Sequence, residues 1–320
     1  MKETMKTLLI GALALTTLCF TSCDDDDLGP TIFDTNDYPL DRSAYTFPLD
    51  TFLKVTYLEP YNMRFIYRME DIGSDMTKNL TPASYEKSVE LAVLLKYLWT
   101  GVYEKYAAPE FLKANAPRII HVIGSKNLNP SQGTETLGEA GGGLKISLFN
   151  TNNLNVADVD MLNEYFIKTI HHEFTHILNQ TKDYPTSFRQ VTPSSYVSDS
   201  QFSEPYVSAY LKRGFITAYA QTNTAEDFAE MVSEYVTHSP EWWEAQMKAA
   251  ETKWSEDADQ TQTGRVLIEQ KLDITRDYMR TVWNIDLDEL RDCILRRQLD
   301  ITSGKIDLTD LTLSSNKASN

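Results

Sequence analysis

The chain has 320 residues, of which 42% are hydrophobic and 11% aromatic, enough for a sizeable core in one or two domains. Its formal net charge at pH 7 is −16, from 46 acidic and 30 basic residues. No basic stretch is available to meet phosphates, so the composition argues against nucleic acid as a partner.

Residues 1–22 have the pattern of a lipoprotein signal peptide. Two lysines precede a mostly apolar run, residues 8–20, that is too short to cross a bilayer comfortably. The run ends in Phe20-Thr21-Ser22-Cys23, which resembles the lipobox of bacterial lipoproteins except that Leu usually stands at the first position. We therefore expect a lipid on Cys23. The acidic run 24–27 resembles a surface-export signal, which implies a surface-exposed outer-membrane lipoprotein. The alternative is a cleaved secretory signal and a free protein.

The mature chain divides by composition into three parts. Residues 23–44 indicate a lipidated cysteine and an acidic, flexible tether. Residues 45–300 indicate one α+β domain, with a sheet-containing half at 45–180 and a mainly helical half at 181–300. Residues 301–320 form a polar tail. With Cys23 lipidated, Cys293 is the only cysteine left, so we expect no internal disulfide.

Three elements are predicted before residue 130. Phe65-Ile66-Tyr67 favours a strand, and Thr81-Pro82 opens a helix that should continue to Tyr106. Residues 118–123 favour a short buried strand. His121 alternates with apolar neighbours there, which is more typical of a core residue than of a metal ligand.

A glycine run, residues 141–143, precedes a predicted strand at 144–149. The alternation of its side chains predicts one buried face. The glycines are not a phosphate loop, because no Gly-Lys-Ser/Thr follows. An edge strand here would receive an extended substrate by strand addition, with Gly143, Leu144 and Ile146 as contacts. The alternative is a hairpin with flexible glycines.

A helix predicted at 157–179 contains His172-Glu173-x-x-His176. Positions i and i+4 lie one turn apart on the same helix face, so two imidazoles can meet one metal ion. Glu173 borders that face and can take a proton from metal-bound water. His171 points away from the pair. The alternative is a surface helix that carries two histidines by chance.

A zinc ion held by two histidines needs a third protein ligand and an open position for water. Thr224 and Asp227 have the spacing of a capping box, so a helix should begin there. Glu226 lies in its first turn and Glu230 one turn further on the same face. Spacing alone does not choose between these two. Weaker candidates are Asp227, Glu204, Glu234 and His238.

Three more helices are predicted at 241–253, 264–283 and 286–298. Three arginines on the last one, Arg291, Arg296 and Arg297, favour a solvated face.

Two motifs together resemble a known peptidase core: His-Glu-Phe-x-His at 172–176 and Tyr-x-x-Thr-Asn-x-Ala-Glu-x-Phe-Ala-Glu at 219–230. Over about residues 170–235 the chain is similar to the catalytic core of anthrax lethal factor. It resembles more closely the zinc metallohydrolase lipoproteins encoded beside TonB-dependent nutrient importers. That second resemblance includes the lipoprotein start and the Trp-Asn-Ile-Asp-Leu stretch at 283–287.

The resemblance implies a zincin-like fold and one Zn²⁺ per chain on His172, His176 and Glu226. It also implies that Tyr219 stabilises the oxyanion or protonates the leaving amine, and that Glu230 holds a ligand histidine in the right tautomer. Glu173 would then act as general base in a zinc-dependent metallopeptidase.

The expected partners are a peptide, protein or glycoprotein substrate, the outer membrane and a TonB-dependent importer complex. One alternative is a non-catalytic surface lipoprotein that binds peptides or glycopeptides and retains a zinc site. Another is a zinc hydrolase that acts on a different bond, because the motif describes water activation and does not name a substrate.

Overall fold

The computed structural model describes residues 42, 44–69, 79–129, 134–141, 143–257 and 259–312. A compact unit begins at Tyr45. The predicted signal peptide, Cys23, nearly all of the predicted tether, Gly142 and the end of the tail lie outside the described residues. No helix among the described residues is long and apolar enough to cross a membrane.

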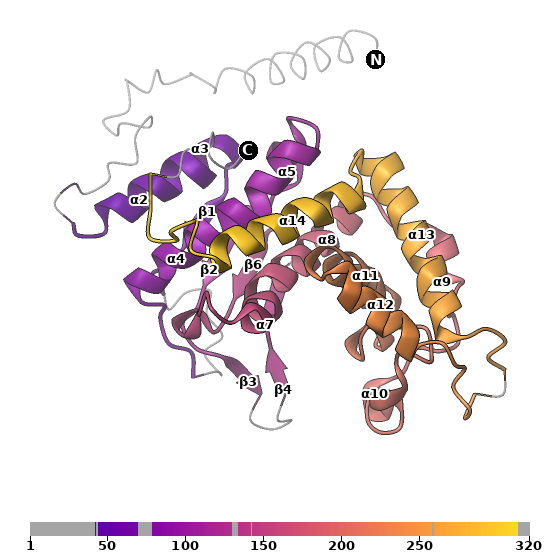
Figure 1. Ribbon diagram of the computed structural model, residues 1–320. Helices are drawn as coiled ribbons and strands as arrows, with labels where there is room; N and C mark the ends of the chain where they lie inside the picture. The colour runs from indigo at the N-terminus through magenta and orange to yellow at the C-terminus, as the bar shows by residue number, and fades with distance from the viewer. Residues whose placement is uncertain are drawn as a thin grey trace, which may run out of the picture. The chain divides into compact units, whose positions relative to one another are not determined.

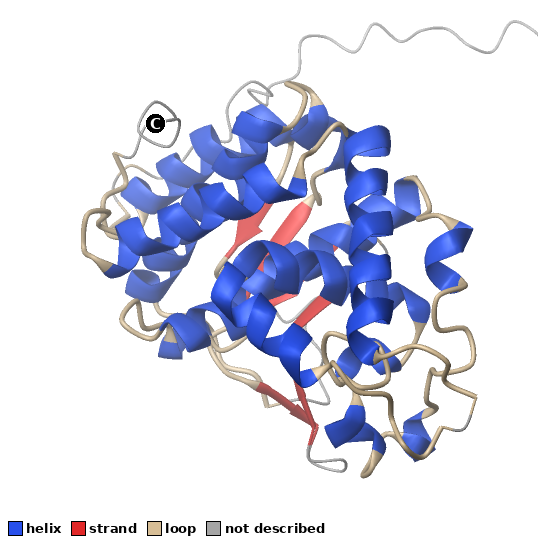
Figure 2. Cartoon of the chain, turned by 45° about the vertical axis from the view of Figure 1, so that its right-hand side comes forward, coloured by secondary structure: helices blue, strands red, loops and turns tan. Residues whose placement is uncertain are grey.

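A small mixed sheet forms the centre of the N-terminal half (Figures 1 and 2). Its strand order is β1-β2-β6-β5, and a separate antiparallel pair is formed by β3 and β4. Strands β1, β2 and β6 are mutually parallel, whereas β5 runs antiparallel to β6. The bounds are β1 Arg64–Ile66, β2 Ile119–Val122, β3 Asn127–Asn129, β4 Thr134–Thr136, β5 Gly138–Gly141 and β6 Lys145–Leu148. The α+β class is therefore confirmed, and the three predicted strands correspond to β1, β2 and β6.

The expectation that residues 143–149 form an edge strand was wrong. Strand β6 lies between β2 and β5, so Ile146 is paired on both sides, with Ile120 and with Ala140. Ser147 is as buried as its apolar neighbours, so the strand has two covered faces rather than one. Gly143 and Leu144 lie in the preceding turn. The edge strand of the sheet is β5.

The helices are joined end to end in several places. The bounds are α2 Phe47–Leu53, η1 Lys54–Leu58, α3 Glu59–Tyr61, α4 Tyr85–Leu95, η2 Lys96–Thr100, α5 Gly101–Tyr106, α6 Phe111–Asn115, η3 Thr151–Asn153, α7 Val159–Leu162, η4 Asn163–Ile167, α8 Lys168–Thr181, α9 Thr186–Arg189, η5 Asp199–Gln201, α10 Tyr206–Ala209, η6 Tyr219–Gln221, α11 Thr224–Thr237, α12 Pro240–Ala249, α13 Gly264–Trp283 and α14 Leu287–Thr302. Of the helices predicted after residue 240, α13 has the predicted bounds.

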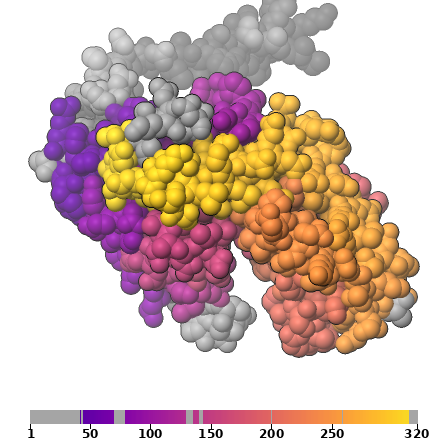
Figure 3. All heavy atoms as spheres, in the orientation of Figure 1, coloured from indigo at the N-terminus to yellow at the C-terminus, as the bar shows by residue number. Residues whose placement is uncertain are grey.

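In Figure 3 the surface is hollowed between the pink region around α7 and the salmon and orange regions of α10 and α12.

The helix predicted from Pro82 begins at Tyr85, because Ser84 caps it by accepting a hydrogen bond from the backbone N–H of Lys87. It then continues through the π-helical segment η2 to Tyr106. A π turn loosens the regular hydrogen-bond ladder of the helix. Two carbonyls of η2 accept side chains from distant helices: Arg297 Nη1 lies 2.6 Å from Tyr97 O, and His171 Nε2 lies 3.3 Å from Leu98 O.

The solvated arginine face predicted on α14 was wrong for two of its three residues. Arg297 is 2% exposed and places its guanidinium over the ring of Tyr97. Arg291 is also buried and donates to the carbonyl of His238, at 2.8 Å. Each cation has an acceptor or an aromatic face inside the protein, so burial is compatible with its charge. Arg296 is exposed as expected.

Helices α8 and α11 form the central pair of the domain. Helix α8 packs on β5 and β6 on one side and on α11 on the other, and α11 also contacts α13 and α14. The predicted apolar stripe of the active-site helix is buried along its length; it consists of Leu162, Phe166, Ile170, Phe174 and Ile177. The ring of Phe174 meets those of Trp99, Tyr103 and Phe111 edge to face. This packing fixes the rotation of α8 about its axis, and with it the direction of the histidines.

Candidate metal centre

The two motif histidines lie on one unbroken helical stretch, residues 159–181, within the longer segment predicted at 157–179. Asp158 caps its start by accepting from the backbone N–H of Met161. Because the apolar stripe faces the core, His172 and His176 face α11. Their Nε2 atoms lie 3.1 Å apart, one turn from each other on the same face.

Helix α11 brings Glu226 to these nitrogens. The helix begins at Thr224, but the predicted capping box was wrong. The side chain of Asn223 accepts from the backbone N–H groups of Ala225 and Glu226 and caps the helix in its place. This cap fixes the first turn, in which Glu226 stands.

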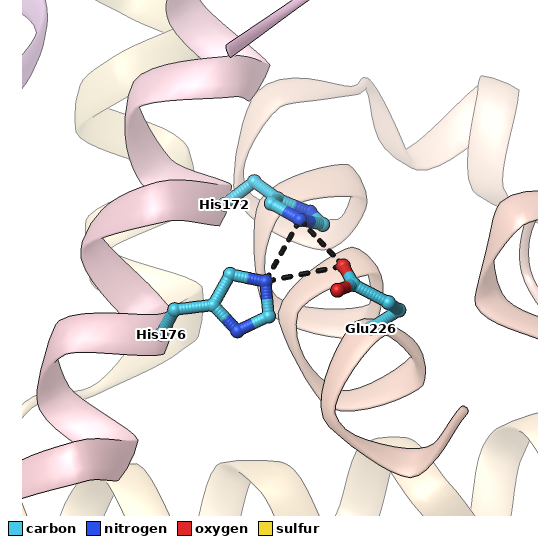
Figure 4. A group of neighbouring side chains, drawn as sticks. All are labelled: His172, His176 and Glu226. Atoms are coloured by element: carbon cyan, nitrogen blue, oxygen red, sulfur yellow. Dashed lines mark hydrogen bonds and ion pairs between the residues drawn. The ribbon is translucent and has the colours of Figure 1, made fainter. Parts of the chain in front are cut away.

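Oε2 of Glu226 lies 3.0 Å from Nε2 of His172 and 3.1 Å from Nε2 of His176 (Figure 4). These three atoms form a nearly equilateral triangle. A tetrahedral zinc ion with bonds of about 2.0–2.1 Å separates its ligand atoms by about 3.3 Å, so the triangle fits a zinc ion with little adjustment. Two imidazole nitrogens and a carboxylate oxygen also match the ligand preferences of zinc. Within the described ranges, this is the one group of three such residues with ligand atoms close enough to share an ion.

Glu230 lies behind the triangle instead of in it. Its Oε1 atom lies 2.8 Å from Nδ1 of His172, on the side of the imidazole opposite to Glu226. Its Oε2 atom lies 3.0 Å from Nζ of Lys168. The two glutamates that spacing could not separate thus have different partners: Glu226 contacts the Nε2 atoms of both histidines, and Glu230 contacts the opposite ring nitrogen of His172. Their ligand and supporting roles stay predictions that metal binding must test.

The weaker ligand candidates have other partners. Asp227 is fully buried against Lys271, and Glu204 accepts from the hydroxyl of Ser208. Glu234 lies between Lys168 and His238, at 2.9 and 3.0 Å. None of these belongs to the triangle.

The centre is strongly anionic. Burial opposes ionisation of Glu226, but its contacts with His172 and His176 outweigh burial and lower its pKa to about 2. Burial likewise opposes protonation of His172, but Glu226 and Glu230 raise its pKa to about 10. Surroundings that hold a proton this firmly on an imidazole also favour a divalent cation at its nitrogen, and such a cation would displace the proton.

The side chain of Glu173, a residue of α8, lies against the edge strand β5. It is 8% exposed, and burial raises the pKa of its carboxyl above the usual value. Gly138 of β5 packs directly against it. A Cβ atom added to Gly138 would lie 3.3 Å from Oε1 of Glu173 and only 2.3 Å from a methyl group of Thr169. The absence of a side chain at this position therefore lets β5 approach the carboxylate closely.

Tyr219 stands in η6, immediately before α11. Its ring centroid lies 6.1 Å from that of His172, and the side chain is half exposed. Burial, with the carboxylates of Glu226 and Glu173, raises the pKa of its hydroxyl above the usual value. The hydroxyl therefore stays protonated and can donate a hydrogen bond at the open side of the centre.

His171, the neighbour of His172, faces the opposite direction. Its Nε2–H group donates to Leu98 O, and its Nδ1 atom lies 3.1 Å from the hydroxyl of Tyr103. Burial lowers the pKa of His171 to about 4, so it is neutral near pH 7. The expectation that it points away from the metal pair agrees with this geometry. His121 is buried in β2, also as expected of a core residue.

Sequence reasoning missed Lys168. A signal was present: Lys168, His172 and His176 recur every fourth residue on one helix, as do Glu226, Glu230 and Glu234 on the other. The contacts pair these two series in opposite order, Lys168 with Glu230 and Glu234, and His176 with Glu226. Basic or histidine residues at four-residue spacing on one helix, and acidic residues at the same spacing on another, indicate that these two faces pack against each other.

Two comparisons with known proteins found a match. Residues 43–288 match the model of a family described as "Putative zinc-binding metallo-peptidase". A crystal structure from Bacteroides caccae, described as a putative zinc-binding metallo-peptidase, is 37% identical in sequence to this chain, with a TM-score of 0.68. The match covers 82% of this chain and 95% of that one. No curated protein matches the chain.

Proposed function

The chain belongs to this zinc-binding metallo-peptidase family, and we propose that it hydrolyses amide bonds in peptides or proteins with one zinc ion on His172, His176 and Glu226. The observation that carries the proposal is the triangle of two Nε2 atoms and one carboxylate oxygen, with edges of 3.0 to 3.1 Å. The carboxylate of Glu173 on the same helix supplies the base that such a centre needs.

The chain's own residues divide the chemistry among them. When bound, zinc would supply a Lewis acid that acidifies a water molecule and polarises a carbonyl group. Glu173 accepts the proton of the attacking water and passes it to the leaving amide nitrogen. Tyr219 donates a hydrogen bond to the developing oxyanion. Glu230 holds His172 so that Nε2 faces the ion.

The substrate is best placed along β5. One edge of β5 pairs with β6, and no other described strand pairs with its second edge. An extended peptide can add to such an edge through backbone hydrogen bonds. Because Gly138 of β5 touches Glu173, a peptide on this edge would present its carbonyls near the base. We therefore propose that residues 138–141, and not Gly143, Leu144 and Ile146, bind the extended substrate.

Metal content tests the centre directly. We expect about one zinc per chain in the purified wild-type protein, and substantially weaker retention in Glu226→Ala, because one of three ligands is lost. The measurement is elemental analysis after dialysis against metal-free buffer. A well-folded, zinc-supplemented wild type without bound zinc would overturn the proposal and favour a peptide-binding protein.

Peptide cleavage tests the reaction. In Glu173→Ala we expect retained zinc and fold but at least a ~100-fold loss of turnover, because the proton acceptor is removed. The assay measures new amino termini released from a mixed peptide library. Turnover close to wild type in this variant would contradict the role of Glu173 as base.

We also propose that a lipid on Cys23 anchors the protein to the outer membrane, in association with a nutrient importer. The support is the signal-peptide pattern and the lipobox-like sequence at 20–23. In cells fed a labelled fatty acid, the wild type should carry the label and Cys23→Ser should not. An unlabelled wild type would favour a cleaved, free protein.

A further inference from the structure

A partly buried lysine stands behind the metal triangle and has no place in the chemistry above. Lys168 is the first residue of α8, one turn before His172 on the same face. Its Nζ atom lies 3.0 Å from Oε2 of Glu230 and 2.9 Å from Oε1 of Glu234. The two carboxylates are themselves one turn apart on α11. Their side chains are 2% and 7% exposed, and that of Lys168 is 19% exposed.

The two oxygens of Glu230 are divided between two partners. Oε2 meets the ammonium of Lys168, and Oε1 lies 2.8 Å from Nδ1 of His172. A carboxylate can turn about its terminal bond, so a cation held on one oxygen fixes where the other oxygen points. The ring position of His172 in turn fixes the direction of its Nε2 atom, which is one corner of the triangle. Lys168 is therefore connected to the metal centre through one carboxylate and one imidazole.

We infer that Lys168 is a positioning residue of the zinc centre, which holds Glu230 so that His172 presents Nε2 to the ion. This inference rests on the proposed function. Residues that orient metal-binding histidines typically change metal affinity or activity by about 10- to 100-fold when they are lost. Lys168 acts one contact further away, through a carboxylate whose burial leaves it few other partners.

The charge of Lys168 alone would have the opposite effect. A nearby ammonium repels a divalent cation, so removing it should strengthen zinc binding if charge were its only influence. Removing it as a positioning residue should weaken zinc binding. A variant that keeps the net charge of the cluster separates these effects, and Glu234 provides one, since it contacts Lys168 without contacting the triangle.

The test compares three proteins: wild type, Glu234→Gln, and the double variant Lys168→Met/Glu234→Gln. The double variant loses one positive and one negative charge, so its net charge equals that of the wild type. Zinc affinity is measured by competition with a chromophoric chelator, after the fold of each protein has been checked by circular dichroism. We expect Glu234→Gln to bind within about threefold of wild type, and the double variant at least about 10-fold more weakly.

The Co²⁺-loaded proteins give a second measurement, independent of turnover. Visible absorption of bound Co²⁺ depends on ligand geometry, so the double variant should show shifted bands while Glu234→Gln retains the wild-type spectrum. If Lys168 only held α8 and α11 together, the double variant would be less stable, but its Co²⁺ spectrum would not change. If the double variant does not fold, Lys168→Gln/Glu234→Gln keeps a polar side chain in the cluster and is expected to show the same loss.

Two results would overturn the inference. If wild type binds zinc and the folded double variant binds it equally well or more tightly, Lys168 does not position His172, and the proposed function stands. If wild type itself takes up no zinc in the competition, the proposed function fails and the inference fails with it.

Discussion

Helix α11 carries a buried lysine–carboxylate contact on each of two sides, and the two contacts have different consequences. On the side facing α8, Lys168 meets both Glu230 and Glu234. On the side facing α13, Lys271 meets Asp227 alone, at 2.6 Å, and both side chains are fully buried. Burial opposes the charge of each lysine. Two carboxylates outweigh it and raise the pKa of Lys168, whereas one carboxylate offsets it only in part, so the pKa of Lys271 is lowered.

The surroundings of the two lysines explain what each contact does. Lys271 also donates to Gly214 O and lies 3.9 Å from the ring centroid of Phe215, and Asp227 accepts from the hydroxyl of Tyr196. None of these partners belongs to the metal triangle. The Lys168 contact instead continues through a carboxylate to His172, whose far nitrogen, Nε2, is one corner of the triangle. The same pair of residue types thus holds the fold together on one side of α11 and supports a metal centre on the other.

Removing one carboxylate from each of the two sides of α11 tests this difference most directly. Asp227→Ala leaves the ammonium of Lys271 buried without its only carboxylate, so we expect a loss of about 3–5 kcal/mol in the free energy of unfolding. Glu234→Ala leaves Lys168 paired with Glu230, so we expect a loss of about 1–2 kcal/mol. Both are measured by urea unfolding of the zinc-free protein. Equal losses of unfolding free energy in the two variants would show that Glu230, which remains beside Lys168, does not stabilise the lysine's charge.

Replacing Lys271 together with its partners should lower the free energy of unfolding less than Asp227→Ala does. The triple variant Tyr196→Phe/Asp227→Leu/Lys271→Met removes both charges and the hydroxyl that contacts Asp227 together, and Gly214 O loses its lysine donor. Well-packed apolar residues often substitute for a buried ion pair without loss, so we expect unfolding free energy within about 2 kcal/mol of wild type. The same urea unfolding measures it. A triple variant as unstable as Asp227→Ala would mean that the fold needs the ion pair itself.

The fold was predictable where periodicity is strong. The stripe from Leu162 to Ile177 placed the active-site helix, and the segment Gly264–Trp283 was placed with its bounds. The edge strand β5 was missed because its sequence, Gly-Glu-Ala-Gly, has no β-branched or aromatic residue. It is formed by pairing with β6 and by contact with α8, so tertiary contacts decide it. The buried arginines of α14 were missed for the same reason: their acceptors, Tyr97 O for Arg297 and His238 O for Arg291, are 200 and 53 residues away in the chain.

The site was predictable to the extent that it lies on one helix. The spacing of His172, Glu173 and His176 requires only the geometry of a helix turn. Glu226 and Glu230 also share one helix face, so spacing could not say which of them meets the ligand nitrogens. The register of α11 against α8 decides it, and that register depends on packing between segments about 50 residues apart. Lys168 was missed because a lysine on a helix is usually solvated.

The smallest effect is expected at the outer end of the Lys168 contact, and it shows how far the supporting network extends. Nδ1 of His238 lies 3.0 Å from Oε2 of Glu234, and its ring stacks on Trp242 with 4.0 Å between centroids. His238→Phe keeps the stacking and removes the polar contact. Partly exposed pairs of this kind contribute about 0–1 kcal/mol, so we expect a loss of about 0.5 kcal/mol in urea unfolding. Zinc affinity in the chelator competition should stay within about twofold of wild type, because Lys168 and Glu230 keep their contact. His238→Ala, which also loses the stacking, should cost more stability and still leave affinity unchanged. A 10-fold loss of zinc affinity in His238→Phe would instead extend the network that positions His172 as far as this histidine.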